Sequence, residues 1–334
     1  MELRYPDYYK KFSCIAAACP DSCCHEWEVD VDPVAAQLYR TMPGDLGDQL
    51  RRVLREGEDG WASMINTPDR RCPMWRQDGL CQIHAQLGHE ALCETCRDFP
   101  RLRHEFGDFA ELGLELSCPE AARIMLSSAD PKWVTETIPG GEEGDYDPAW
   151  LEVLTVSRQR ARDMVMDENL PLGVALSHLI LYAAQVQCAE SPEDLADFDP
   201  ETQIESLPLQ AFPGSMEDVW QVYRGLEVLT DRWQQILDRG SLEAPWLPVH
   251  RALARYFIDR YWLQAVSDGE VMLRAKFMAV SCLVVRHMGG DPVAAAQLYS
   301  KEIENDPDNV DTLFDAMEME NAFADLRLLN LLRN

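Results

Sequence analysis

The sequence predicts a mainly α-helical protein with a cysteine-rich N-terminal domain that contains little β-structure. Nine of its eleven cysteines lie between residues 14 and 118. Beyond that point apolar residues recur at spacings of three and four, which is the period of an amphipathic helix. The stretch IPGGEEGDYDP at 138–148 is typical of a linker. We therefore expect a cysteine-cluster domain over 1–138, a linker at about 139–148 and an acidic helical domain over 149–334.

The composition is that of a globular protein, since 46% of the 334 residues are hydrophobic and 26% are charged. No apolar run approaches the roughly 20 residues that a membrane span needs, so we expect no membrane association. The N-terminal sequence MELRYPDYYKKFSC lacks the apolar core of a signal peptide, which predicts a cytoplasmic location. The net charge of −28 would repel a nucleic acid and attract a basic partner or a lysine-bearing substrate; a role in solubility alone is the alternative.

Helix starts are marked by a residue followed by proline, because proline fits the first helical position. This pattern occurs at Asp32-Pro33, Cys118-Pro119, Asp147-Pro148 and Asp291-Pro292, and Pro171 and Pro307 open two further helical patterns. The stretches 217–239, 248–266 and 268–288 also keep helical apolar spacing. Strand signals occur at 28–32 and 106–116, and we expect these two stretches to form a small hairpin beside the cysteines.

Cys188 and Cys282 lie apart from the other cysteines within apolar stretches, where a small thiol packs well. We expect both in the core. Four tryptophans on helical stretches are also expected in the core, with a groove between helices as the alternative: Trp220, Trp233, Trp246 and Trp262.

The remaining nine cysteines are the candidate metal ligands: Cys14, Cys19, Cys23, Cys24, Cys72, Cys81, Cys93, Cys96 and Cys118. A disulfide framework would need secretion, and the cluster has neither a signal peptide before it nor an even number of cysteines. Thiolates held by a metal suit a reducing compartment. The four cysteines over 14–24 are close enough to bring three or four sulfurs to one centre. Cys93 and Cys96 form a CxxC pair, a spacing typical of zinc and iron–sulfur sites.

The spacing leaves more than one metal open. A structural zinc ion takes four cysteine or histidine ligands, whereas iron–sulfur clusters prefer cysteines. Nine thiols exceed what one zinc ion uses, which favours an iron–sulfur cluster or two metal sites and leaves zinc as the alternative. His25, next to Cys24, is the best histidine candidate for a ligand. His84, His89 and His104 are more typical of surface or supporting groups.

Three stretches carry a resemblance to a known family. They are YYKKFSCIAAACPDSCCHEWEVDVD at 8–32, RCPMWRQDGLCQIHAQLGHEALCETCRDFPR at 71–101 and ELSCPEAAR at 115–123. In combination they resemble the flagellin lysine-N-methylase (FliB-like) family, within the wider zinc- or iron-chelating cysteine-cluster proteins. The resemblance covers residues 5–125 closely and the acidic remainder only in length and general character.

The resemblance implies transfer of methyl groups from S-adenosylmethionine to lysine side chains of flagellin or another lysine-bearing protein. It also implies that the nine cysteines hold a metal centre, a 4Fe-4S cluster in preference to zinc. Two interpretations of other classes stay open. One is a non-catalytic, metal-stabilised protein that binds a partner, and the other is an iron–sulfur protein that transfers electrons.

The usual cofactor-binding motifs are missing from the sequence. No Gly-rich turn follows a strand in the manner of a doubly wound sheet. The CxxxCxxC spacing usual for radical cleavage of S-adenosylmethionine is incomplete, because Glu26 occupies the third position after Cys19 and Cys23. Arg97 and Arg101 are candidates to bind the cofactor carboxylate or to stabilise an anionic cluster, with a structural salt bridge as the alternative.

No catalytic residue is assigned from the sequence. Lysine methylation by a polar mechanism needs a deprotonated amine, which a nearby carboxylate or tyrosine can produce. Five residues flank the first cysteine loop and are candidate bases: Tyr5, Tyr8, Tyr9, Glu26 and Glu28. Each of them is equally consistent with a surface or packing role.

Overall fold

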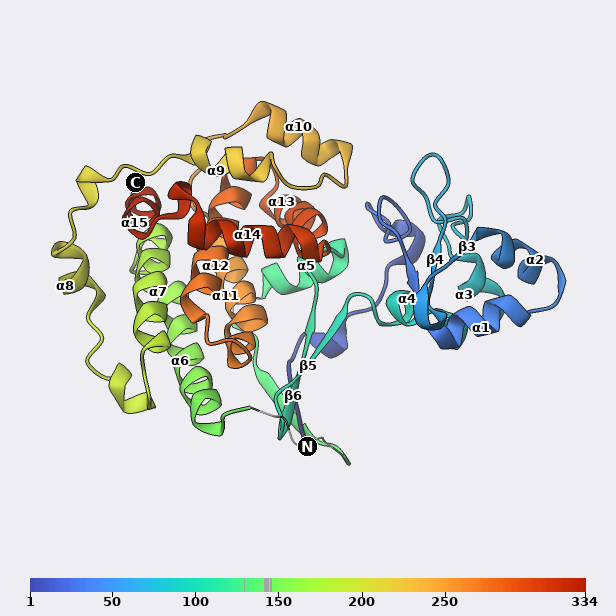
Figure 1. Ribbon diagram of the computed structural model, residues 1–334, viewed down its shortest axis with the longest axis horizontal. Helices are drawn as coiled ribbons and strands as arrows, with labels where there is room; N and C mark the ends of the chain where they lie inside the picture. The colour runs from blue at the N-terminus through green and yellow to red at the C-terminus, as the bar shows by residue number, and fades with distance from the viewer. Residues whose placement is uncertain (129, 141–143, 145) are drawn as a thin grey trace.

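Two lobes of unequal size make up the chain (Figure 1). The computed structural model describes residues 1–128, 130–140, 144 and 146–334. The small lobe holds helices α1 to α4, and the large lobe holds the helices from α5 onward together with a four-stranded sheet. The prediction of a mainly α-helical protein is confirmed.

The four-stranded sheet is built from the N-terminus and three later strands. Its order is β5-β6-β1-β7, with bounds Arg101–Glu105, Phe109–Leu114, Glu2–Pro6 and Trp133–Thr137. β1 runs parallel to β6 and antiparallel to β7, while β5 and β6 form an antiparallel hairpin. Because the chain leaves this sheet after β1 and returns at β5, the small lobe is an insertion between strands of the sheet.

The small lobe has its own sheet and its own hydrophobic core. The sheet order is β2-β4-β3, with bounds Asp30–Val31, Ala62–Met64 and Leu54–Glu56. The helices are α1 (Pro33–Thr41), α2 (Gly44–Val53), α3 (Gln82–Leu87) and α4 (Glu94–Asp98). The core includes Tyr39, Leu50 and Met64 together with the buried side chains of Cys72 and Cys93. Two candidate ligands are therefore part of the packing of this lobe.

Asp32 connects two helices of the small lobe. As predicted, it caps α1, and its Oδ1 accepts hydrogen bonds from the backbone N–H groups of Val34 at 3.1 Å and Ala35 at 3.0 Å. Its Oδ2 accepts from the backbone N–H of Glu94, the first residue of α4, at 2.8 Å. One carboxylate thus fixes the helix of the CxxC pair relative to α1.

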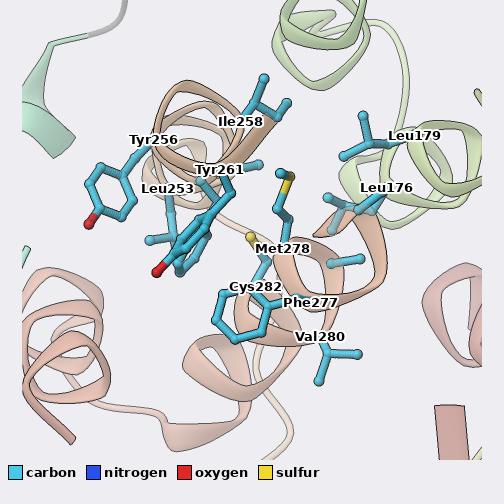
Figure 2. Packing of buried hydrophobic residues seen from close by; sticks show 14 of the residues in the cluster. Leu176, Leu179, Leu253, Tyr256, Ile258, Tyr261, Phe277, Met278, Val280 and Cys282 are labelled. Carbon is cyan, nitrogen blue, oxygen red and sulfur yellow. The ribbon is translucent and has the colours of Figure 1, made fainter. Parts of the chain in front are cut away.

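The large lobe is a helical assembly whose core lies between α6, α7, α11 and α12. Figure 2 shows Leu176 and Leu179 of α7, Leu253 of α11 and Met278 of α12 in this core. The helices are α5 (Pro119–Ser127), α6 (Pro148–Met166), α7 (Leu172–Gln187), α8 (Pro200–Glu205), α9 (Met216–Tyr223), α10 (Asp231–Arg239), α11 (Pro248–Tyr261), α12 (Val271–Met288), α13 (Pro292–Tyr299), α14 (Pro307–Met319) and α15 (Asp325–Arg333). A π-helix, η8 (Ser300–Glu304), directly continues α13.

Short 3-10 segments join these elements. They are η1 (Tyr9–Lys11), η2 (Ala16–Ala18), η3 (Glu58–Gly60), η4 (His89–Ala91), η5 (Pro192–Leu195), η6 (Leu209–Ala211), η7 (Trp262–Val266) and η9 (Asn321–Phe323). The predicted helix starts at 33, 119, 148, 292 and 307 are confirmed, and the helix expected from Pro171 begins one residue later.

The helical spacing over 217–239 is divided between two helices, because α9 ends at Tyr223 and α10 begins at Asp231. Within the break, the N–H of Glu227 donates to Asn309 Oδ1 at 2.9 Å, and the N–H of Leu229 donates to Glu302 Oε2 at 2.8 Å. Side chains from distant segments therefore satisfy backbone groups that a helix would otherwise have to pair.

The hairpin predicted from 28–32 and 106–116 is wrong. The strand β2 in the first stretch pairs with β4, and β6 in the second pairs with β5 and β1. The partner strands β4, β5 and β1 carry no strong alternation of apolar residues. Their pairing depends on the neighbouring strand and not on a local pattern.

The hydrophobic core of the large lobe combines segments that are far apart in the sequence. The core of the large lobe takes in Tyr8, Phe12 and residues within 106–126 as well as the later helices. The predicted linker at about 139–148 falls in part on residues 141–143 and 145, which lie outside the described residues. The division into domains at this linker stays a prediction.

Most of the predicted core residues outside the cysteine cluster are buried. Cys282, Trp220, Trp233 and Trp262 are fully buried, and Trp246 packs against the same core while partly exposed. Cys188 is exposed, which corrects the prediction, because it follows the last residue of α7 where the chain turns away from the core. Among the described helices, none combines the length and the apolar character needed to cross a bilayer.

A buried polar layer joins the sheet to the helices of the large lobe. Arg158 of α6 makes a bidentate ion pair with Glu111 of β6, at 2.6 and 2.5 Å, and both side chains are less than a tenth exposed. Arg260 Nε forms an ion pair with Glu304 Oε1 at 3.1 Å, and the hydroxyl of Tyr261 donates to the same oxygen at 2.8 Å. This layer borders a cavity of about 40 Å³.

Candidate metal centre

Seven of the nine candidate cysteines line one cavity of about 340 Å³. They are Cys14, Cys19, Cys23, Cys24, Cys81, Cys96 and Cys118. Most of the lining belongs to the small lobe, but Ser117, Cys118 and Pro119 at the start of α5 and Lys301 of η8 belong to the large lobe. The cavity is therefore closed by both lobes.

The other two cysteines lie directly behind this lining. Cys72 donates its backbone N–H to the carbonyl oxygen of Cys24 at 2.8 Å. Cys93 forms a side-chain hydrogen bond with Cys96. All nine predicted ligands are thus gathered at one place, although they are spread over more than a hundred positions of the sequence.

Three of the thiols occupy the position just before a helix. Cys81 precedes α3, Cys93 precedes α4 and Cys118 precedes α5. Unpaired backbone N–H groups at a helix start favour the thiolate form of a cysteine. Backbone hydrogen bonds from Glu120 and Ala121 act in this direction on Cys118. The backbone N–H groups at the start of these three helices therefore lie near the sulfur atoms.

Burial opposes this effect and keeps most of the thiols protonated. Desolvation raises the pKa of Cys72 and of Cys118 to about 11, and nearby thiols add to the increase. The pKa of Cys23 is raised first by its hydrogen bond with Cys24 and then by burial, while the positive charge of Lys301 acts in the opposite direction. Cys23 lines the cavity, so solvent in the cavity reaches its side chain even though protein surrounds the cavity. Metal binding would have to displace these protons.

Cys93 differs from the other thiols with a shifted pKa because its hydrogen bond with Cys96 lowers its pKa. Donation from Cys96 lowers the pKa of Cys93, and the same bond raises the pKa of Cys96. Cys93 is the thiol of this pair that ionises first. A CxxC pair with one readily ionised sulfur is suited to begin metal capture.

The donor chemistry fits a sulfur-ligated centre. Across the described residues, no three His, Cys, Asp or Glu side chains converge as ligands of a single metal ion. A tetrahedral zinc ion, with Zn–S bonds of about 2.3 Å, would draw its sulfurs to within about 3.8 Å of one another. A cluster with several irons holds its thiolates on different iron atoms and so spreads them more widely. The thiols on the wall of one 340 Å³ cavity suit a thiolate-ligated centre of either kind.

The histidines divide into three environments. His84 and His89 line the cavity. His25, the histidine predicted as the best ligand candidate, is absent from the cavity lining; its Nε2 lies 3.2 Å from the carbonyl oxygen of Asp69 and its Nδ1 lies 3.5 Å from Glu26 Oε1. His104 borders the separate small cavity of the large lobe, and burial lowers its pKa.

Both arginines predicted to bind the cofactor line the cysteine cavity. Arg97 has a long contact of 3.4 Å from Nε to Asp98 Oδ1. The guanidinium of Arg101 lies 5.1 Å from the ring centre of Phe12. Neither contact is a bidentate salt bridge, so both side chains keep donors for an anionic ligand.

The candidate bases lie away from the cavity lining. Tyr5 donates to Glu136 at 2.5 Å, Tyr8 borders the small cavity of the large lobe, and Glu28 pairs with Arg55. Tyr9 is half-buried beside Tyr5. Glu26 is bound to Lys301. The structure therefore assigns these groups to packing and ion pairs.

Lys301 is the residue of this site that sequence reasoning missed. Its Nζ donates to Asp21 Oδ1 at 2.9 Å and to Glu26 Oε2 at 2.8 Å, and the side chain is only 2% exposed. No local signal could identify it, because its partners are some 280 positions earlier in the chain.

Glu302, the residue after Lys301, gives a pH-dependent prediction. Burial raises the pKa of its carboxyl from the ordinary 4.5 to about 7. The folded state therefore binds a proton that the unfolded state has released, and stability should fall as the pH rises from 4.5 to 7. We expect Glu302→Gln to be more stable than the native protein at pH 8, by up to about 3 kcal/mol, and to gain little at pH 4.5. Urea unfolding at both pH values measures this difference, and equal gains at the two values would contradict it.

Three proteins of known name are similar to part of this chain. Lysine-N-methylase of Salmonella typhimurium (strain LT2) is 29% identical over 137 residues, which are 39% of this chain and 34% of that protein. Lysine-N-methylase of Salmonella choleraesuis matches to the same extent. Flagellar biosynthetic protein FliU of Salmonella muenchen is 30% identical over 132 residues, which are 37% of this chain and 77% of that protein.

The match spans about a third of the length of the two lysine-N-methylases. No family model matches the chain, and no solved structure matches it.

Proposed function

Because this chain belongs to the flagellin lysine-N-methylase family, we propose that it transfers methyl groups from S-adenosylmethionine to lysine side chains of flagellin or another lysine-bearing protein. The observation that supports this function best is the cavity of about 340 Å³ lined by seven cysteines and two arginines. Small-molecule sites usually have volumes of about 300 to 1,000 Å³, so the cavity is large enough for a cofactor.

We propose a 4Fe-4S cluster as the metal centre, held by cysteines of the cavity, with zinc as the alternative. When bound, such a cluster supplies an iron atom that can ligate a cofactor and exchange electrons. The protein groups around it have distinct tasks. Arg97 and Arg101 bind the carboxylate of the cofactor, and the rings of Trp27 and Phe99, which pack edge to face at 5.3 Å, shield the cavity from water.

The protein substrate is proposed to be basic at the contact surface. The net charge of −28 attracts a lysine-rich segment at low salt. Added salt screens the charges and weakens this attraction. The acceptor amine must lose its proton before or during transfer, and none of the residues placed above is assigned to this step.

The test is anaerobic purification with assays of iron, zinc and acid-labile sulfide, followed by titration with S-adenosylmethionine and mass spectrometry of flagellin incubated with both. Iron with sulfide, cofactor binding and added mass of 14 Da per methyl group on lysine support the proposal. Zinc without sulfide and no cofactor binding would favour a metal-stabilised partner-binding protein. Iron and sulfide without cofactor binding would favour an electron carrier.

Arg97→Met and Arg101→Met test the cofactor site separately from the metal site. We expect each to weaken S-adenosylmethionine binding by about tenfold or more, because a charge-assisted hydrogen bond contributes about 1.5 to 3 kcal/mol. Metal content should be unchanged. Arg123→Met is a matched control, since Arg123 pairs with Glu120 on the surface. Equal cofactor affinity in all three variants would contradict the assignment.

A further inference from the structure

The cavity wall contributed by the large lobe includes one buried lysine. Lys301 lies in η8, a π-helical segment of five residues that follows α13. Such segments are rare and occur frequently at functional sites. The widened turn places Lys301 at the cavity, while Glu302 and Glu304 of the same segment contact other parts of the large lobe.

The ammonium group of Lys301 binds both ends of the short segment 21–26, which contains Cys23 and Cys24. Asp21 and Glu26, its two partners, stand on either side of Cys23 and Cys24 in the sequence. Their side chains are 13% and 19% exposed, so the three charges are largely shielded from water. The same ammonium lies 5.7 Å from the ring centre of Trp27.

A second side chain of the large lobe supports this arrangement. Gln297, one turn before Lys301 on α13, donates from Nε2 to Asp21 Oδ2 at 2.9 Å. Its Nε2 also donates to the carbonyl oxygen of Ser117 at 2.9 Å. Ser117 immediately precedes Cys118, so the contacts of Gln297 connect the cysteine loop to the cysteine at the start of α5.

We propose that Lys301 is a positioning residue of the cysteine centre: through Asp21 and Glu26 it holds Cys23 and Cys24 against the large lobe, and its charge offsets that of the thiolates. The inference rests on the proposed function only in taking these cysteines as metal ligands. A buried ammonium paired with two carboxylates leaves one net negative charge, and losing the ammonium would leave two. The two carboxylates would then repel each other, and the segment that carries Cys23 and Cys24 would move away from the large lobe.

The experiment compares Lys301→Met, Lys301→Arg and a matched control, Lys276→Met, in the full chain. Lys276 is also a buried lysine with an ion pair, to Asp325, but it is absent from the cavity lining. Two quantities are measured for each folded variant. One is metal bound per chain after anaerobic purification, and the other is the alkylation rate of Cys23 and Cys24 in metal-free protein, resolved by peptide mass spectrometry.

We expect Lys301→Met to lose at least fivefold in bound metal and to alkylate at Cys23 and Cys24 at least fivefold faster. Lys301→Arg should recover at least half of the metal content, and Lys276→Met should match the native protein. If the centre is redox-active, the metal that Lys301→Met retains should have a more negative reduction potential, because a neighbouring positive charge is gone. Native metal content and alkylation rates in Lys301→Met, or equal losses in Lys276→Met, would overturn the proposal.

If Lys301→Met does not fold, Asp21→Asn replaces it in the experiment, because this variant keeps the lysine and removes one of its carboxylate partners. Faster alkylation of Cys23 and Cys24 in Asp21→Asn supports the proposal, and an unchanged rate overturns it. If the native protein binds no metal, the proposed metal centre fails, and the alkylation rates still decide the role of Lys301.

Discussion

Replacing Cys23 with alanine should lower the affinity of the protein for the proposed metal by at least about 100-fold, or about 2.7 kcal/mol. Cys23 lines the cavity together with Cys24 and Lys301, and its thiol interacts with those of Cys19, Cys24 and Cys118. Because metal-binding energy contributes to the folding of small sites, the small lobe should also lose stability.

Metal analysis and limited proteolysis of the small lobe measure both effects. Cys188→Ala is the matched control, since Cys188 is exposed and outside the cavity. We expect native metal content and native protease resistance in this control. A Cys23→Ala protein with full metal content and an intact small lobe would remove Cys23 from the set of ligands.

Replacing Arg158 with methionine should destabilise the large lobe by about 3–5 kcal/mol, because it leaves the carboxylate of Glu111 buried without its partner. Both side chains are less than a tenth exposed, and the guanidinium also lies 5.5 Å from the ring centre of Trp133. The pair connects β6 to α6, so its loss affects the contact between sheet and helices.

Urea unfolding of two further variants tests this explanation. The double variant Glu111→Leu with Arg158→Met should recover part of the loss, because no unpaired charge remains. Arg123→Met removes an arginine that is 64% exposed and should change the free energy of unfolding by no more than about 1 kcal/mol. A double variant that is no more stable than Arg158→Met would contradict the role of the unpaired charge.

The sequence predicts the features of this protein that depend on neighbouring residues. The capping of α1 by Asp32 is a contact between residues two and three positions apart, so it is visible in the sequence. The break between α9 and α10 is not visible, because Asn309 and Glu302 stabilise it from far along the chain. The strands β1 and β7 were missed for the same reason, since each is defined by its partner.

The candidate site shows the same limit. Residue type and spacing point to the nine cysteines, and seven of them line one cavity in the structure. Lys301 was not identified, since a lysine in a helical stretch has the same local pattern whether it faces water or two buried carboxylates. The exposure of Cys188 was missed because the apolar residues before it belong to α7, which ends at Gln187.

The insertion of the small lobe between β1 and β5 has a consequence for the order of folding. Leu3 must pair with Ala110 across roughly a hundred residues, and the entropy lost in closing such a loop slows contacts between distant segments. A small lobe that has already collapsed shortens the effective loop. If the proposed metal centre forms early in folding, the N-terminal sheet should close faster with metal present than without it, and the refolding rate of the whole protein would depend on metal supply.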